Sequence, residues 1–233
     1  MVRLLNTRSH GALPGRARRR AEARRVAILR AAARVFRERG YAAAGMREIA
    51  VAADLSPGNL YHYFRGKDEI LFFCQDRSLD RLLDALRVAR RSSRSRSGKA
   101  DVSCQLRRLA EAHVLCLIDE VEGSAAHLEV DALPSRLRRA IVAKRDLYER
   151  GVRSLVARGI RGHSLRAADA TVMTRAFLGA LNWTAQWFRP DGPQRPHEIA
   201  AAVADYAVAG LAAPGLPVPA LAALEPATPR LTA

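Results

Sequence analysis

The sequence predicts an all-α protein in which a small N-terminal domain precedes a larger C-terminal one, and three observations support this prediction. Apolar residues recur every three or four positions along most of the chain. No segment shows the alternation of polar and apolar residues that a half-buried β-strand requires. Ser, Pro and Gly, which are common at helix ends, occur where the periodic segments begin and end. With 233 residues, the chain is long enough to bury a core in each domain.

The first long helix is predicted over Arg16–Arg39, because Ile28 and Phe36 belong to an apolar set on one helical face. Gly40 follows and is suited to end this helix, since glycine readily adopts the left-handed conformation of a C-terminal cap. Residues 1–15 show no periodicity, so we expect a disordered tail there.

Two short helices and a second long one follow. The first short helix is predicted over Met46–Ala53, and the second over Pro57–Tyr63. Ser56 is suited to cap the second helix, because its hydroxyl can accept from a free backbone N–H, and Pro57 fits the first helical position. A break at Arg65-Gly66 separates it from a long helix that begins near Lys67.

The rest of the chain is also helical in pattern. The helix that begins near Lys67 is expected to end within the Arg- and Ser-rich residues 90–99. Residues 212–233 contain Ala, Pro and Leu without a useful period, so we expect a second disordered tail. The other predicted helices are Val102–Val121, Pro134–Ala157, Ala167–Phe188 and Pro196–Leu211.

One long helix followed by two short ones, all joined by tight turns, predicts a helix-turn-helix domain over residues 16–66. The second short helix would be the recognition helix. Ala50 and Ala53 are small, as required where two helices cross closely. The apolar residues expected to form the core are Phe36, Ile49, Ala50, Ala53, Leu55, Leu60 and Phe64.

The charge of the chain points to a polyanionic partner, either nucleic acid or an acidic membrane surface. The formal net charge is +16, and residues 1–100 hold 23 Lys and Arg against 9 Asp and Glu. No apolar run approaches the roughly 20 residues of a membrane span. No apolar stretch of signal-peptide length precedes the N-terminal arginines, so we expect a cytoplasmic protein. Three cysteines without CxxC spacing favour neither a disulfide framework nor a zinc site.

The segment ILRAAARVFRERGYAAAGMREIAVAADLSPGNLYHYFRGKDEIL, residues 28–71, resembles the DNA-binding domain of the TetR family of bacterial transcriptional repressors. The resemblance covers about residues 26–75, and its most specific parts are REIA, LYHYF and the Lys-Asp-Glu that follows. It implies an all-α homodimer. Each subunit would join the helix-turn-helix domain to a C-terminal domain, residues 67–211, that binds a small molecule and dimerises.

The resemblance also implies DNA contacts at particular positions. Asn59 and His62 share one helical face and suit base edges, whereas Tyr61 and Lys67 offer donors to phosphate oxygens. Gly58 leaves room for the DNA backbone. The full set of expected DNA contacts is Arg47, Ser56, Gly58, Asn59, Tyr61, His62, Tyr63 and Lys67. For Tyr63, a place in the core is the alternative.

One position departs from the family pattern. Where the family usually has Thr, capping the first short helix and contacting a phosphate, this chain has Gly45. Glycine is an acceptable N-cap at a cost of a few tenths of a kcal/mol, but it offers no side-chain contact to phosphate.

Basic residues at the start of the chain form a second candidate DNA contact. As a flexible arm they could enter the minor groove or lie along phosphates. The alternative is a solvated charge run that aids solubility. The arginines concerned are Arg16, Arg18, Arg19, Arg20, Arg24 and Arg25.

The C-terminal half contains no catalytic signature, so the sequence predicts that the protein is not an enzyme. A phosphate loop, GxSxG, HExxH and a dinucleotide fingerprint are all missing from the sequence. His113 and His127 have no neighbouring carboxylate-histidine cluster, so we predict no metal and no cofactor.

The segment FLGALNWTAQWFRPDGPQRPHEIAAAVADYAVAGL, residues 177–211, suits a dimer interface. Gly179 and Ala180 allow close helix approach, while Trp183 and Trp187 supply apolar area for a two-fold four-helix contact. Its NWTxxWFRPDGP pattern is similar to TetR-family regulators of lipid, acyl-CoA and steroid catabolism. That similarity implies that the effector is a CoA thioester of a fatty or steroid acid.

The effector pocket is expected among the middle helices. Basic Arg136, Arg139 and Lys144 could meet a CoA phosphate. The alternative is that all of these residues are ordinary core and helix surface. The expected pocket residues are His113, Leu117, Leu128, Tyr148, Val152, Met173, Phe177 and Trp183.

Together these features predict a dimeric repressor that binds a palindromic DNA operator and is released by a small hydrophobic effector, without contact to a membrane. Half-sites lie about one DNA turn, roughly 34 Å, apart, so a small rotation of the subunits would abolish binding. A regulator of efflux or resistance genes that responds to hydrophobic drugs is the alternative. An enzyme that uses the C-terminal cavity and a nonspecific architectural DNA binder are alternatives of other classes.

Overall fold

The computed structural model describes residues 15–91, 101–118 and 130–213. Within these ranges the chain forms α-helices. One isolated β-bridge pairs Leu165 with Ala212. The predicted all-α class is therefore confirmed. The predicted tails lie almost entirely outside the described residues.

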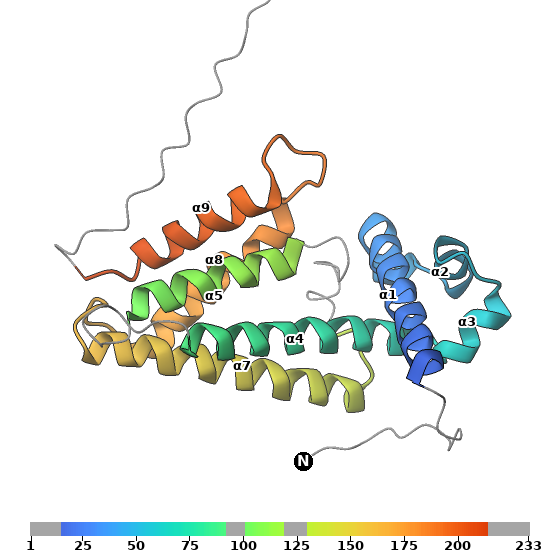
Figure 1. Cartoon of the computed structure of the whole chain (residues 1–233), viewed down its shortest axis with the longest axis horizontal. Helices are drawn as coiled ribbons and strands as arrows, with labels where there is room; N and C mark the ends of the chain where they lie inside the picture. The colour runs from blue at the N-terminus through green and yellow to red at the C-terminus, as the bar shows by residue number, and fades with distance from the viewer. Residues whose placement is uncertain (1–14, 92–100, 119–129, 214–233) are drawn as a thin grey trace, which may run out of the picture.

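The helices form two groups, as Figure 1 shows. The first three lie together at one end, and α4 extends from them along the bundle of α5, α7, α8 and α9. The helices are α1 (Gly15–Ala43), α2 (Met46–Ala52), α3 (Pro57–Tyr63), α4 (Lys67–Arg91), α5 (Val102–Ile118), α7 (Ser135–Arg161), α8 (Ala170–Trp187) and α9 (Pro196–Ala209).

The boundaries of α1, α7 and α8 differ from the predictions. Gly40 has φ 76° and breaks the regular helix as expected, but a further helical turn carries α1 on to Ala43. The next difference is that α7 continues past Ala157 to Arg161. Finally, α8 begins at Ala170 rather than Ala167, because the Asp169 carboxylate accepts from the Val172 N–H at 2.8 Å and caps the helix there.

The core of the helix-turn-helix domain consists of the residues that were predicted to form it. Phe36, Ile49, Ala50, Ala53, Leu60 and Phe64 are buried, and Leu55 is half-buried against them. The predicted cap is confirmed, since Ser56 Oγ accepts from the Asn59 N–H at 3.2 Å. At Gly45 the carboxylate of Glu48 instead reaches back and accepts from the Gly45 N–H at 3.0 Å. This is the half of a capping box that needs no side chain at the cap.

Lys67 joins the N-terminal unit to α4. Its Nζ donates to the carbonyl oxygens of Tyr41 and Ala42 at 3.0 Å each and of Ala44 at 3.3 Å. The same atom lies 4.6 Å from the centroid of the Tyr41 ring. Because an ammonium has three N–H donors, all of them cap the C-terminal end of α1.

Ion pairs between helices reinforce the C-terminal bundle. Lys144 on α7 lies 2.5 Å from Asp76 and 2.8 Å from Asp80, both on α4. Arg107 on α5 pairs with Asp205 on α9 at 2.5 Å. These contacts fix α4 against α7 and α9 against α5.

Replacing Lys67 tests its role as a cap. We expect Lys67→Met to lower the free energy of unfolding by about 1–3 kcal/mol, because the variant keeps the aliphatic stem but leaves carbonyls of α1 without their donor. The matched control Arg65→Met removes the charge of an exposed side chain nearby. Urea titration of both variants measures the difference, and equal stability would contradict the cap.

Candidate nucleic-acid interface and ligand cavity

The short helix α3 divides its residues between core and solvent. Leu60 and Phe64 are buried, one turn apart, and fix the helix on the small core. Asn59 and His62 are exposed, and Tyr61 keeps 54% of its surface open to solvent. Tyr63 is half-buried and packs on the core, so the alternative of a core role holds for at least part of this ring.

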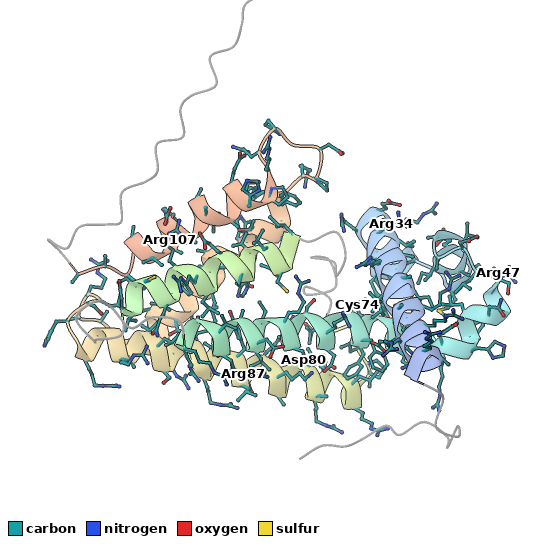
Figure 2. All side chains as sticks on the ribbon, viewed as in Figure 1. Arg34, Arg47, Cys74, Asp80, Arg87 and Arg107 are labelled. Atoms are coloured by element: carbon teal, nitrogen blue, oxygen red, sulfur yellow. The ribbon has the colours of Figure 1, made fainter. Side chains whose placement is uncertain are left out.

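The N-terminal ends of α2 and α3 leave an open surface. Ser56 and Gly58 are exposed, and no heavy atom lies within 4 Å of the position that a Cβ at Gly58 would take. Arg47, in the first turn of α2, is exposed, and Figure 2 shows it at the edge of the N-terminal unit farthest from the C-terminal helices. This surface has the polar and basic groups that DNA recognition needs.

Lys67 has a structural role that the sequence did not predict. Its donors are engaged with the carbonyls at the end of α1. Lys67 thus supports the position of the N-terminal unit, and its contact to a phosphate stays a prediction.

The segment Arg16–Arg25 was predicted as a flexible arm but is helical, because α1 already begins at Gly15. Arg24 Nη2 donates to the Asp54 carbonyl at 2.9 Å, and the Arg25 guanidinium lies 5.8 Å from the Phe64 ring centroid. These two arginines hold the turn between α2 and α3 and cover its core. Arg16, Arg19 and Arg20 are exposed on the first turns of α1.

A cavity of about 450 Å³ lies between α4, α5, α7 and α8. The predicted residues His113, Leu117 and Tyr148 line it. Its other lining residues are Leu79, Leu82, Arg145, Glu149, Arg175, Leu178, Gly179, Asn182 and Ala185.

Several predicted pocket residues lie elsewhere. Val152 and Phe177 are buried in the general core, and Met173 is half-buried against it. Trp183 is 67% exposed on the outer side of α8. Leu128, like His127, lies outside the described residues.

The basic residues expected to meet a CoA phosphate are not part of the cavity wall. Arg136 and Arg139 are exposed near the start of α7. Lys144 is occupied by Asp76 and Asp80. The contact of these three basic residues to a CoA phosphate therefore stays a prediction, and the arginines that line the cavity are Arg145 and Arg175.

Helical spacing could have revealed the residues that were missed. Arg145 lies three residues before Tyr148 and four before Glu149, so it shares a face of α7 with each of them. On α8, Arg175, Gly179 and Asn182 recur at spacings of four and three, whereas Trp183 is one residue, about 100°, further round the helix.

A polar network in the cavity wall joins two buried rings, His113 and Tyr148, to the exposed Asn182. His113 Nδ1 lies 2.9 Å from the Tyr148 hydroxyl, and His113 Nε2 lies 3.0 Å from Asn182 Oδ1. Because Asn182 Oδ1 can only accept, Nε2 carries the proton, and Nδ1 accepts from the Tyr148 O–H. Burial lowers the pKa of His113 to about 4, against the opposing effect of the Asn182 hydrogen bond, and burial raises the pKa of Tyr148. Both rings are therefore neutral at neutral pH.

The described residues show neither a metal cluster nor a membrane-spanning helix. No group of three or more His, Cys, Asp or Glu side chains among them is arranged to hold a metal ion. In the same ranges, no helix combines the length and apolarity needed to cross a bilayer.

Both halves of the chain match known family models. Residues 28–72 match the bacterial regulatory proteins of the tetR family, and residues 99–211 match the tetracyclin repressor-like C-terminal domain. A curated relative is the HTH-type transcriptional repressor KstR2 of Rhodococcus jostii. It is 28% identical over 196 residues, which cover 82% of this chain and 92% of the relative.

Two solved structures are also similar to this chain over most of its length. The TetR family transcriptional regulator PfmR from Thermus thermophilus is 34% identical, with a TM-score of 0.69, and the match covers 78% of this chain and 97% of PfmR. AibR in complex with isovaleryl coenzyme A and operator DNA is 25% identical, with a TM-score of 0.64 and coverage of 81% and 97%.

The buried imidazole predicts a pH dependence of stability. Unfolding exposes His113, whose pKa then rises from about 4 to its usual 6.5. The unfolded chain therefore binds the proton first, and stability present above pH 6.5 is lost as the pH falls toward 4, by at most about 3 kcal/mol. Urea titrations between pH 7.5 and 4.5 should show a steeper loss for the wild type than for His113→Gln, and parallel profiles would contradict a neutral buried imidazole.

Proposed function

Because this chain belongs to the TetR family of bacterial transcriptional regulators, we propose that it is a repressor that binds a palindromic DNA operator as a homodimer. A small effector in the C-terminal cavity releases it from the DNA. The observation that supports this most directly is the outward polar face of α3, formed by Asn59, Tyr61 and His62 on a helix anchored by Leu60 and Phe64.

In this proposal α3 enters the major groove. Asn59 and His62 contact base edges, and Tyr61 donates to a phosphate oxygen. Arg47 lies on the same side of the unit and reaches the groove or the DNA backbone. The exposed arginines at the start of α1, including Arg19 and Arg20, add charge for neighbouring phosphates.

The outer faces of α8 and α9 form the dimer interface. Trp183 and Trp187 on α8 are 67% and 45% exposed, and Tyr206 on α9 is 76% exposed. Two such helices from each subunit would bury these large side chains in a four-helix contact. A two-fold dimer would then present two copies of α3 to the two half-sites of a palindrome.

Release from the DNA would result from a movement of α4, which connects the cavity to the N-terminal unit. Leu79 and Leu82 belong to the cavity wall, and the same helix begins at Lys67, whose ammonium holds the end of α1. A ligand that displaces α4 therefore moves the whole N-terminal unit and changes the spacing of the recognition helices. Only a ligand with different affinities for the two arrangements shifts the equilibrium.

We infer that the effector is a CoA thioester of a fatty or steroid acid. The relative AibR, solved in complex with isovaleryl coenzyme A and operator DNA, supports this inference. A regulator of efflux genes would instead respond to hydrophobic drugs. Gel-shift titrations of the chain against its own upstream DNA, with acyl-CoA thioesters or drugs added, test both possibilities.

Two substitutions in α3 separate base recognition from positioning. Asn59→Ala should cost about 1–3 kcal/mol in operator affinity and leave binding to random DNA unchanged, because it removes contacts to a base edge. Tyr61→Phe should weaken binding to both DNAs alike, because it removes a phosphate donor. Fluorescence anisotropy at fixed salt measures all four affinities, and an unchanged operator affinity in Asn59→Ala would refute the base contact.

A charge on the exposed tryptophan tests the dimer. Trp183→Asp should give a monomer in sedimentation velocity, because it places an unpaired carboxylate in the proposed interface. Val142→Asp is the matched control, since Val142 is also an exposed apolar residue, 42% open to solvent, but lies on α7. A Trp183→Asp protein that remains dimeric would exclude the α8–α9 interface.

A further inference from the structure

The side chains of the cavity wall are neutral and apolar in its deep part and cationic at its opening. We propose that its ligand is an anionic amphiphile, with a hydrocarbon tail directed inward and a negatively charged head at Arg145 and Arg175. This inference rests on the proposed function of the cavity as the effector site. It adds the residues that hold the charged head and the direction in which the ligand binds.

The deep part of the wall suits a hydrocarbon. Leu79, Leu82 and Leu117 are at most 3% exposed and line the cavity from α4 and α5. Such a surface gains free energy by covering apolar area and offers no polar partner. A tail of CH₂ groups or fused rings fits this chemistry.

The buried polar groups at depth do not change that conclusion. The O–H of Tyr148 is taken by His113, and the N–H of His113 is taken by Asn182. Both donors are thus used within the protein, and neither ring carries a charge at neutral pH. Beside these two rings, a tail rich in acceptor atoms would lose hydrogen bonds to water and gain none from the rings.

The opening of the cavity, in contrast, carries charged side chains. Arg175 is exposed on α8 and Arg145 is half-buried on α7, and both line the cavity. Glu149 is the acidic side chain of the lining, but Arg153 lies 3.5 Å from its carboxylate and balances it. Burial lowers the pKa of the Arg145 guanidinium, against the opposing effect of the Asp131 charge, and this partial loss of water strengthens its attraction for an anion. The opening therefore has a positive potential.

A guanidinium in a partly desolvated site binds an oxyanion more strongly than a neutral group, because charge-assisted hydrogen bonds are stronger there. A carboxylate and a phosphate both satisfy this requirement. The head can therefore be the carboxylate of a free acid or the phosphates of a thioester carrier, and the experiment distinguishes these sources.

The test uses the full chain and three probes that share an eight-carbon acyl tail. Octanoate carries a carboxylate, octanoyl-CoA carries phosphates, and the octanoyl thioester of N-acetylcysteamine is neutral. We expect at least one anionic probe to bind with a Kd tenfold or more below that of the neutral probe in isothermal titration calorimetry. Tight binding of octanoate identifies a carboxylate head, and binding of octanoyl-CoA alone identifies phosphate.

Charge removal provides the second readout. Arg175→Gln should weaken the binding of the preferred anionic probe about tenfold and leave the neutral probe unchanged. The matched control Arg150→Gln removes an exposed arginine of α7 that does not line this cavity and should change neither. Equal binding of neutral and anionic probes, or equal effects of the two variants, would overturn the proposal.

Operator binding is measured in the same samples by gel shift. A chain that binds its operator but none of the three probes would refute the anionic amphiphile and leave the proposed DNA-binding function intact. A chain that binds a probe with the expected charge preference but no operator would refute the proposed function instead.

Discussion

The contact between the Lys67 ammonium and the carbonyls of Tyr41, Ala42 and Ala44 determines how the two halves of the molecule act on each other. A helix that ends without partners for its carbonyls frays, and a flexible junction would let the DNA-binding unit move independently of the bundle. Here the first residue of α4 supplies those partners. Since α4 also forms part of the cavity wall, the cavity and the N-terminal unit share one continuous helix.

Signals confined to a few neighbouring residues were enough to predict the N-terminal unit. Gly40, Ser56 and Pro57 have backbone preferences that act locally, and the structure places each of them in the predicted role. The capping role of Lys67 was missed because its partners lie about 25 residues earlier, which no local pattern indicates. Its sequence position beside a recognition helix suits a phosphate contact equally well.

The cavity was predicted less well, because helix periodicity identifies apolar faces but not what each face meets. Helix α8 has three faces, toward the core, the cavity and solvent, and apolar residues occur on all of them. Phe177, Gly179 and Trp183 could not be assigned among these faces without the packing of α5 and α7. The polar residues Asn182 and Arg175 were overlooked because the polar candidates for the effector site, such as His113 and Tyr148, all came from α5 and α7.

The separation of tasks within α3 has a consequence for evolution and engineering. The side chains of Asn59, Tyr61 and His62 contribute nothing to the buried core, which depends on Leu60 and Phe64. Under the proposed function, gene duplicates can therefore diverge in operator preference through point changes at these positions while the scaffold and the proposed effector response persist. The same independence would make the chain a starting point for biosensors in which the promoter that is controlled and the metabolite that is detected are chosen separately.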